Sequence, residues 1–256
     1  MLLVISPAKT LDYETLLPTR VHTMPDYLDD AAQLVKRARK YSVDDVKTLM
    51  AVSEKIALLN VERFKKWRRP LTSKHARQAM LAFKGDVYVG LDAFTMSEGD
   101  LAFAQQHLRI LSGLYGLLRP LDLMLPYRLE MGRKIDTERG KNLYEFWGDS
   151  ITEGLNDQFQ RKGSKYLINL ASNEYFKVIK PKLLQAEIIT PHFKEYKNGD
   201  YKVLGVYAKR ARGMLSRYII KNRIEEPEAI KQFCEGGYRF NAAMSSEYDW
   251  VFARKK

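Results

Sequence analysis

The chain has 256 residues, 45% of them hydrophobic, which is enough to bury one substantial core. Its 43 lysines and arginines outnumber its 31 aspartates and glutamates, and the net charge of +12 favours polyanionic partners over small neutral ones. The single cysteine, Cys234, excludes an intramolecular disulfide framework, and no apolar run approaches the roughly 18 residues of a membrane-spanning helix. We therefore expect a cytoplasmic protein with no signal peptide and no membrane partner.

The first half of the chain predicts one strand followed mainly by helices. Leu-Leu-Val-Ile at 2–5 predicts a buried strand, and the proline-containing stretch 6–25 predicts an ordered loop. Apolar residues spaced i, i+3, i+4 and i+7 predict a helix over 29–40. Ser-Val-Asp-Asp at 42–45 has the pattern of a capping box, which marks a helix start. The other elements expected here are a helix over 53–67, a helix over 74–83, a strand over 86–90 and a helix over 98–111.

The second half contains a hairpin signal. Asn198-Gly199 lies between two strand-like segments, and Asn-Gly is the preferred pair in two-residue hairpin turns. Helices and strands alternate irregularly, and no linker rich in Gly, Ser or Pro divides the chain. The sequence therefore predicts a mixed α/β (α+β) fold of one domain, residues 1–256, with a mixed sheet wrapped by helices. The other elements expected here are helices over 142–161, from Ser172 and over 208–224, a short helix from Pro227, and strands over 166–170, 237–240 and 247–253.

Residues 207–223 contain six cations and no carboxylate. On a helix, the apolar residues of this segment share one arc, except Ile220, which lies among the cations, and all six cations lie outside that arc. Arg217 and Lys221 are four residues apart, a like-charged spacing that costs roughly a few tenths of a kcal/mol. The pattern fits either an ordinary amphipathic helix with a solvated basic face or a surface that binds phosphate. The six cations are Lys209, Arg210, Arg212, Arg217, Lys221 and Arg223.

A second basic run spans residues 63–77, with seven cations and no carboxylate. Trp67 lies inside this run, where its indole either stacks on an unpaired base or packs at the end of an amphipathic helix. The sequence leaves open which of these holds. It also leaves open whether the two basic runs meet in one groove.

Signals for metal binding and catalysis are weak. The four histidines lack the spacing of a metal site, so we expect no metal and no cofactor. Lys9 lies in Ser-Pro-Ala-Lys-Thr at 6–10, which follows a strand but lacks the glycines of a phosphate-binding loop. Carboxylates lie in polar clusters, with Asp86 near Lys84, Glu130 near Arg128 and Glu174 beside Tyr175. These acids are either halves of ion pairs or members of a pocket that groups titratable residues for proton transfer.

Six motifs follow one another along nearly the whole chain. They are ISPAKTLDY at 5–13, AFKGDVYVGL at 82–91, LRILSGLYGLLRPLDLMLPYRLEMG at 108–132, LYEFWGD at 143–149, INLASNEYFK at 168–177 and YAKRARGMLSRYII at 207–220. Together they closely resemble the bacterial YaaA family. The resemblance implies a DNA-binding protein of the peroxide stress response, which limits iron-dependent oxidative damage and binds duplex or branched DNA with little sequence preference. It also implies a barrel-like mixed sheet jacketed by helices, a helix-hairpin-helix element and a positively charged cleft.

By position, the hairpin of that element maps to residues 112–119. Glycines in such a turn let backbone N–H groups approach a phosphate. However, Gly113 and Gly116 are three residues apart, whereas hairpins of this kind usually space their glycines two apart, so a purely structural turn is the alternative. The residues expected to bind DNA are Lys9, Gly113, Gly116, Arg119, Arg128, Lys209, Arg210, Arg212, Arg217 and Lys221.

The leading hypothesis is a non-enzymatic, monomeric DNA-binding protein. Because the chain lacks a metal-ligand cluster, we expect any protection from iron to be indirect. The alternative is an enzyme that acts on a nucleotide or a nucleic-acid base, in a pocket lined by Lys9, Asp86, Glu130 and Tyr175. A deep pocket lined by those four residues favours the enzyme, and their dispersal into separate salt bridges counts against it.

Overall fold

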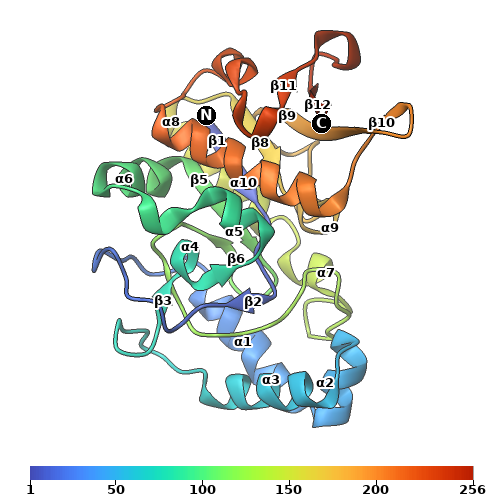
Figure 1. Ribbon diagram of the computed structural model, residues 1–256. Coiled ribbons are helices and arrows are strands. Elements are labelled where there is room, and N and C mark those ends of the chain that lie inside the picture. The colour runs from blue at the N-terminus through green and yellow to red at the C-terminus, as the bar shows by residue number, and fades with distance from the viewer. Residues whose placement is uncertain (256) are drawn as a thin grey trace.

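The computed structural model describes residues 1–255, which form one mixed α/β unit (Figure 1). The strands are β1 (Leu2–Ile5), β2 (Thr10–Leu11), β3 (Arg77–Gln78), β4 (Phe83–Lys84), β5 (Leu108–Ser112), β6 (Gly116–Leu118), β7 (Leu123–Met124), β8 (Tyr166–Leu170), β9 (Glu187–Lys197), β10 (Asp200–Lys202), β11 (Arg239–Phe240) and β12 (Asp249–Arg254). The α-helices are α1 (Leu28–Ala38), α2 (Val43–Met50), α3 (Glu54–Lys66), α4 (Ala79–Ala82), α5 (Asp86–Leu91), α6 (Glu98–His107), α7 (Leu143–Trp147), α8 (Ser150–Lys162), α9 (Asn173–Phe176) and α10 (Gly205–Lys221). Short 3-10 helices span Ala93–Thr95, Pro227–Gln232, Glu235–Gly237 and Ala242–Met244.

Strands from both ends of the chain build the main sheet, in the order β11-β12-β9-β8-β1-β5-β6, with β10 paired to β9. β1 lies inside the sheet and pairs in parallel with β5 on one side and β8 on the other. The pairs β8–β9 and β9–β12 are also parallel, whereas β6 and β11 add antiparallel strands at the two edges. The predicted mixed sheet is confirmed. It is an open sheet and does not close into a barrel.

The central strands are apolar on both faces. All four residues of β1 are buried, and in the register Leu3 lies between Leu108 of β5 and Ile168 of β8. Near-continuous apolar runs are typical of parallel strands that are covered on both sides. Because β1 and β8 are parallel neighbours, their carboxyl ends, Ile5 and Leu170, meet at the same edge of the sheet.

Two groups of helices lie on different parts of the molecule. In Figure 1, α5, α6 and α10 lie in front of the sheet, and α1, α2 and α3 lie at the opposite end of the molecule. The predicted capping box is confirmed at the start of α2. There the Ser42 hydroxyl accepts from the Asp45 N–H at 3.1 Å, and the Asp45 carboxylate accepts from the Ser42 N–H at 2.8 Å.

Four predicted elements differ from the structure. The strand predicted for 86–90 is helix α5, and the helix predicted for 98–111 stops at His107 and continues as β5. The helix predicted for 142–161 is broken at Gly148, whose φ of 51° is left-handed. Of the helix predicted for 74–83, only α4 is helical.

Candidate functional site

A pocket of about 410 Å³ opens beyond the carboxyl ends of β1 and β8, and we call it the strand-end pocket. Its walls come from the loop after β1, the turn that leads into α5, the start of α9, and α10. Hydrogen bonds join these parts. The Ser6 hydroxyl, in the loop after β1, accepts from the Ser172 N–H at the start of α9 at 2.8 Å. The Tyr88 hydroxyl of α5 donates to the Ser6 carbonyl at 3.2 Å. Short polar contacts therefore fix the walls to one another.

The four residues of the sequence-based alternative, Lys9, Asp86, Glu130 and Tyr175, all line the strand-end pocket. They come from positions far apart in the chain: Lys9 and Tyr175 follow the parallel strands β1 and β8, Asp86 begins α5, and Glu130 lies in the loop after β7. Ion pairing is also present, but it does not disperse them: Lys9 lies 3.5 Å from Glu130 inside the pocket. The geometry therefore provides the grouped titratable residues that proton-transfer chemistry needs.

Charge in the pocket is divided between mouth and floor. The cations Lys9 and Lys84 have side chains that are 61% and 65% exposed, and Lys209 of α10 is exposed as well. Glu130 and Tyr175 are buried. Asp86 and Glu174 are exposed and line the pocket as well, so a ligand entering it meets three lysines and two carboxylates first, and Glu130 and Tyr175 deeper in.

Glu130 is the most constrained side chain of the pocket. Its Oε1 accepts from the Arg128 guanidinium at 3.1 Å, and Arg133 and Lys9 lie 3.6 and 3.5 Å away. Its Oε2 is buried and has no hydrogen-bond partner among the described residues. One oxygen is therefore held by three cations, and the other is left as an unsatisfied acceptor.

Burial favours the neutral form of the tyrosines around the pocket. Burial raises the pKa of Tyr175 well above its ordinary value, and it does the same for the pKa values of Tyr88 and Tyr127. A tyrosine hydroxyl is protonated at neutral pH even at its ordinary pKa of about 10, and burial strengthens that preference. The Tyr88 proton is already donated to the Ser6 carbonyl.

Helix α10 reaches the pocket because two glycines let it pack closely on α5. A Cβ on Gly213 would lie 1.8 Å from the Val87 carbonyl oxygen, and one on Gly90 would lie 2.1 Å from the Arg210 carbonyl oxygen. Only glycine allows this backbone approach. The contact places Lys209 and Arg212 beside the Asp86–Tyr88 segment that lines the pocket.

The six cations predicted on this helix divide into two halves. In the C-terminal half, Arg217 donates to the carbonyls of Leu91 and Asp92, and Lys221 and Arg223 each lie 2.9 Å from the buried Asp100 carboxylate. Folding therefore supplies acids to Arg217 and Lys221, although residues 207–223 contain none. The acids that pair with them come from residues 92 and 100, far from α10 in sequence.

The N-terminal half of α10 is different. Within residues 1–255, Lys209, Arg210 and Arg212 form no ion pair. Lys209 and Arg210 are exposed, and burial in the pocket wall lowers the pKa of Arg212. The positive charge available to a partner is therefore concentrated at this end of the helix.

The predicted hairpin at 112–119 is a β-hairpin and not a helix-hairpin-helix. Residues Ile110 to Ser112 of β5 pair with Gly116 to Leu118 of β6. Gly113 and Gly116 are both buried: a Cβ on Gly113 would lie 2.3 Å from the Leu129 carbonyl oxygen, and one on Gly116 would lie 2.7 Å from the Trp147 ring. The mapping of a phosphate-binding turn onto these glycines is wrong, because they are needed for packing.

Two other predicted DNA-binding arginines are held by acids of the chain. Arg119 lies 3.1 Å from the buried Asp122 and 3.0 Å from Asp26. Arg128 is paired with Glu130 and its side chain is only 15% exposed. Both arginines orient carboxylates, and neither presents a free guanidinium to solvent.

The second basic run, at 63–77, does not meet the first one in a common groove. Figure 1 shows α3 at the opposite end of the molecule from α10. Trp67 is buried, and its indole N–H donates to the Tyr115 hydroxyl at 2.9 Å, so it packs and does not present a stacking surface. Arg77 is buried too, where it donates to the Asp12 carbonyl.

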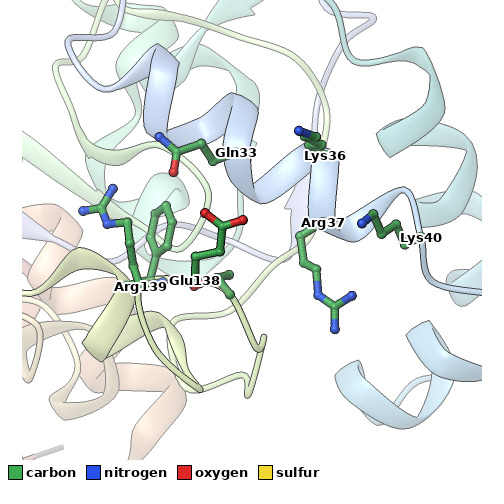
Figure 2. A pocket seen from close by; sticks show the side chains of 8 residues that line it. Gln33, Lys36, Arg37, Lys40, Glu138 and Arg139 are labelled. Atoms are coloured by element: carbon green, nitrogen blue, oxygen red, sulfur yellow. Dashed lines mark hydrogen bonds between the residues drawn. The ribbon is translucent and has the colours of Figure 1, made fainter.

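A second hollow, of about 270 Å³, lies between α1 and the loop before α7 (Figure 2). Figure 2 shows that the guanidinium groups of Arg37 and Arg139 point in different directions, with the Glu138 carboxylate between them. Arg37 donates to the Asp136 carbonyl and Arg139 pairs with Asp30. The charged groups of this second hollow do not converge on one point, so the strand-end pocket is the better candidate for the functional site.

The prediction missed several polar residues of the strand-end pocket. Ser6 comes directly after the strand predicted at 2–5, and Ser172 comes two residues after the strand predicted at 166–170. Their position at the carboxyl ends of buried strands was the signal that could have identified them as pocket residues. Lys84 lies in the segment predicted to lead into a strand, and no pattern in its sequence marks it as a pocket residue.

Among the described residues, no group of three or more His, Cys, Asp and Glu side chains is placed to hold a metal ion. No helix within residues 1–255 is both long enough and apolar enough to cross a membrane.

The fold and the pocket define a mixed α/β protein with a ligand-sized polar pocket at the carboxyl ends of parallel strands, the usual place for ligands in such sheets. A family model described as "Peroxide stress protein YaaA" matches residues 1–244, and the chain belongs to this family. It is 58% identical over 256 residues to a UPF0246 protein of Teredinibacter turnerae, with 100% of both chains covered. It is 55% identical to one of Aliivibrio fischeri (strain MJ11) and 52% identical to one of Cupriavidus pinatubonensis, with all of this chain and 99% of each relative covered.

Proposed function

We propose that this peroxide stress protein binds DNA through its phosphates, with the N-terminal half of α10 at the centre of the contact. The observation that carries the proposal is the contrast within this helix. Lys209, Arg210 and Arg212 form no ion pair in residues 1–255, whereas the next three cations are held by Asp92, Asp100 and backbone carbonyls. A phosphate backbone supplies the negative charge that the protein does not.

The cationic mouth of the strand-end pocket extends this surface. Lys9 and Lys84 line the same pocket as Lys209. Lys9 lies 3.5 Å from Glu130 and Lys84 lies 3.8 Å from Asp12, but both side chains are mostly exposed, so positive charge continues from α10 to the pocket mouth. Contacts to phosphate position a protein on DNA but carry no base information. The protein, acting as a monomer, therefore binds duplex or branched DNA with little sequence preference, and it limits iron-dependent oxidative damage by covering the DNA.

The test is a pair of double variants with equal loss of charge. Lys209→Ala with Arg210→Ala removes two exposed cations from the proposed contact. Lys47→Ala with Lys66→Ala removes two exposed cations, free of ion pairs within residues 1–255, from α2 and α3 at the other end of the molecule. We expect the first variant to bind duplex DNA about tenfold more weakly than wild type, because phosphate contacts are lost. The affinity of the second variant should fall by less than about threefold. Equal losses in a fluorescence anisotropy titration would show that only net charge matters, and would contradict the proposal.

The strand-end pocket supports a second candidate function, an enzyme that acts on a nucleotide or a nucleic-acid base. The observation that favours it is the convergence of Lys9, Asp86, Glu130 and Tyr175 on one pocket. Such an enzyme must first bind its nucleotide there, and that requirement is open to direct measurement.

A further inference from the structure

We propose that the strand-end pocket holds a single nucleotide, with the phosphate at the cationic mouth and the base against the free oxygen of Glu130. The inference rests on the second candidate function for its site, but it concerns binding and not turnover. It does not depend on DNA binding by α10.

The carboxylate of Glu130 provides the first argument. Glu130 is 3% exposed, lines the pocket, and leaves Oε2 with no donor among residues 1–255. A buried acceptor without a donor costs free energy, and a charged one costs more. The three cations around Oε1 keep the carboxylate from turning to satisfy both oxygens within the protein. Oε2 has almost no accessible surface, so a ligand N–H reaches it only when the pocket wall shifts on binding, and that contact then removes this cost.

The polarity of the pocket provides the second argument. Around the mouth the three exposed lysines, Lys9, Lys84 and Lys209, outnumber the two exposed carboxylates, Asp86 and Glu174, and the acceptor of Glu130 is buried in the floor. The matching ligand is anionic at one end and carries N–H donors at the other. A nucleotide has this form, because its phosphate is anionic and adenine, cytosine and guanine carry exocyclic amino donors.

The walls and size of the pocket provide the third argument. Val87, Tyr88 and Tyr175 line it and give it the apolar and aromatic surface that flat heterocycles bury. Its volume of about 410 Å³ lies within the range of small-molecule sites. A base paired inside a duplex cannot enter such a pocket, so the nucleotide is either free or extruded from a strand.

Calorimetric titration of the full-length protein tests the ligand class. The probes are the four deoxynucleoside 5′-monophosphates, the matching nucleosides, inorganic phosphate and a short single-stranded oligonucleotide. We expect at least one monophosphate to bind more tightly than both its nucleoside and inorganic phosphate, since both ends of the ligand are used. Binding of the oligonucleotide alone, with loss of that binding on Glu130→Gln, would identify a strand as the source of the nucleotide. Inorganic phosphate binding as tightly as every nucleotide would overturn the inference, and so would no binding of any base-containing probe at millimolar concentration.

Two variants separate the two ends of the ligand. Lys84→Ala, which leaves the cations of Glu130 in place, should weaken binding of the monophosphate about fivefold to tenfold and leave binding of the nucleoside unchanged. Glu130→Gln should weaken both by about tenfold, because the cations hold the amide oxygen and turn the NH₂ group, a donor, toward the base. Lys47→Ala, remote from the pocket, is the matched control and should bind as wild type.

The outcomes distinguish this inference from DNA binding by α10. Unchanged nucleoside binding by a folded Glu130→Gln protein would overturn the role of Glu130. If circular dichroism shows that this variant does not fold, the Lys84→Ala result decides, and equal weakening of nucleoside and monophosphate would then contradict the inference. If the protein binds duplex DNA but no nucleotide, only the nucleotide site in the strand-end pocket is overturned. If it binds nucleotides but no duplex DNA, only DNA binding by α10 is overturned.

Discussion

At the scale of single residues, two buried carboxylates surrounded by cations have opposite roles. Asp100 uses both oxygens: Oδ1 pairs with Arg223, and Oδ2 pairs with Lys221 and accepts from the Ser97 N–H. Glu130 uses only one. A carboxylate that is fully satisfied within the protein serves the fold, whereas one with an unsatisfied oxygen is available to a ligand.

The pairing of Asp100 should make stability depend on pH. Burial alone would raise the pKa of Asp100, but hydrogen bonds from Lys221, Ser97 and Arg223 outweigh it and hold that pKa well below its ordinary value. A lowered folded-state pKa stabilises the protein above the unfolded pKa of about 3.9, and this contribution is lost as pH falls below it. Asp100→Asn should therefore lower the unfolding free energy by about 2 kcal/mol at pH 7, with a smaller difference from wild type at pH 3.

The matched control is Asp92→Asn. Asp92 is half exposed, lies 3.8 Å from Arg217 and has a left-handed φ of 47°, which asparagine also adopts. Its loss should cost less than about 1 kcal/mol in urea denaturation, because exposed ion pairs contribute little. A difference between Asp100→Asn and wild type that is the same at pH 7 and pH 3 would contradict the role given to the Asp100 carboxylate.

The sequence did not reveal these partners because they are remote along the chain. Lys221 and Asp100 are separated by 121 positions. The lack of acids near Arg217 and Lys221 in sequence says nothing about the acids that folding brings to them. The grouping of Asp86, Glu130 and Tyr175 was open to prediction only as an alternative, for the same reason.

At the scale of elements, local signals predicted what local contacts determine. The capping box at Ser42 forms its hydrogen bonds within a few residues, and the apolar run at 2–5 needs only a buried position in a sheet. Both predictions are confirmed. Residues 86–90 have β-branched and aromatic character, yet they form α5. Val87 and Tyr88 are adjacent and both buried, while Val89 is 55% exposed, a helical burial pattern set by packing on α10.

The α5–α10 contact makes a prediction of its own. Gly213→Ala places a Cβ 1.8 Å from the Val87 carbonyl oxygen and 2.7 Å from the Leu91 nitrogen, both in backbone that cannot give way easily. We expect a loss of about 3 kcal/mol and a melting temperature lower by about 6–12 °C. DNA affinity should fall as well, because α10 moves away from the pocket.

Gly205→Ala, at the start of the same helix, is the control. Nothing lies within 4 Å of the position of a Cβ there, so alanine should leave stability unchanged or raise it by up to about 1 kcal/mol. Equal melting temperatures for the two variants in differential scanning calorimetry would show that the helices do not depend on this close approach.

At the scale of the whole molecule, the net charge of +12 predicted a polyanionic partner but not where such a partner would bind. The pairing of β1 with β5 and β8, which no local pattern records, places the strand-end pocket beside α10. The same topology leaves the basic run at 63–77 at the other end of the molecule. The mixed sheet was predictable from the irregular order of helices and strands, whereas the position of the site depends on strand order.

The most direct measurement of the central claim is the salt dependence of duplex DNA binding by the wild-type protein and by the Lys209→Ala, Arg210→Ala variant. For phosphate contacts, the logarithm of the association constant falls linearly with the logarithm of salt concentration, with a slope of about −0.9 per contact. The account predicts a linear dependence for wild type and a slope shallower by up to about 1.8 for the variant. A wild-type affinity that does not change with salt, or identical slopes for the two proteins, would contradict it.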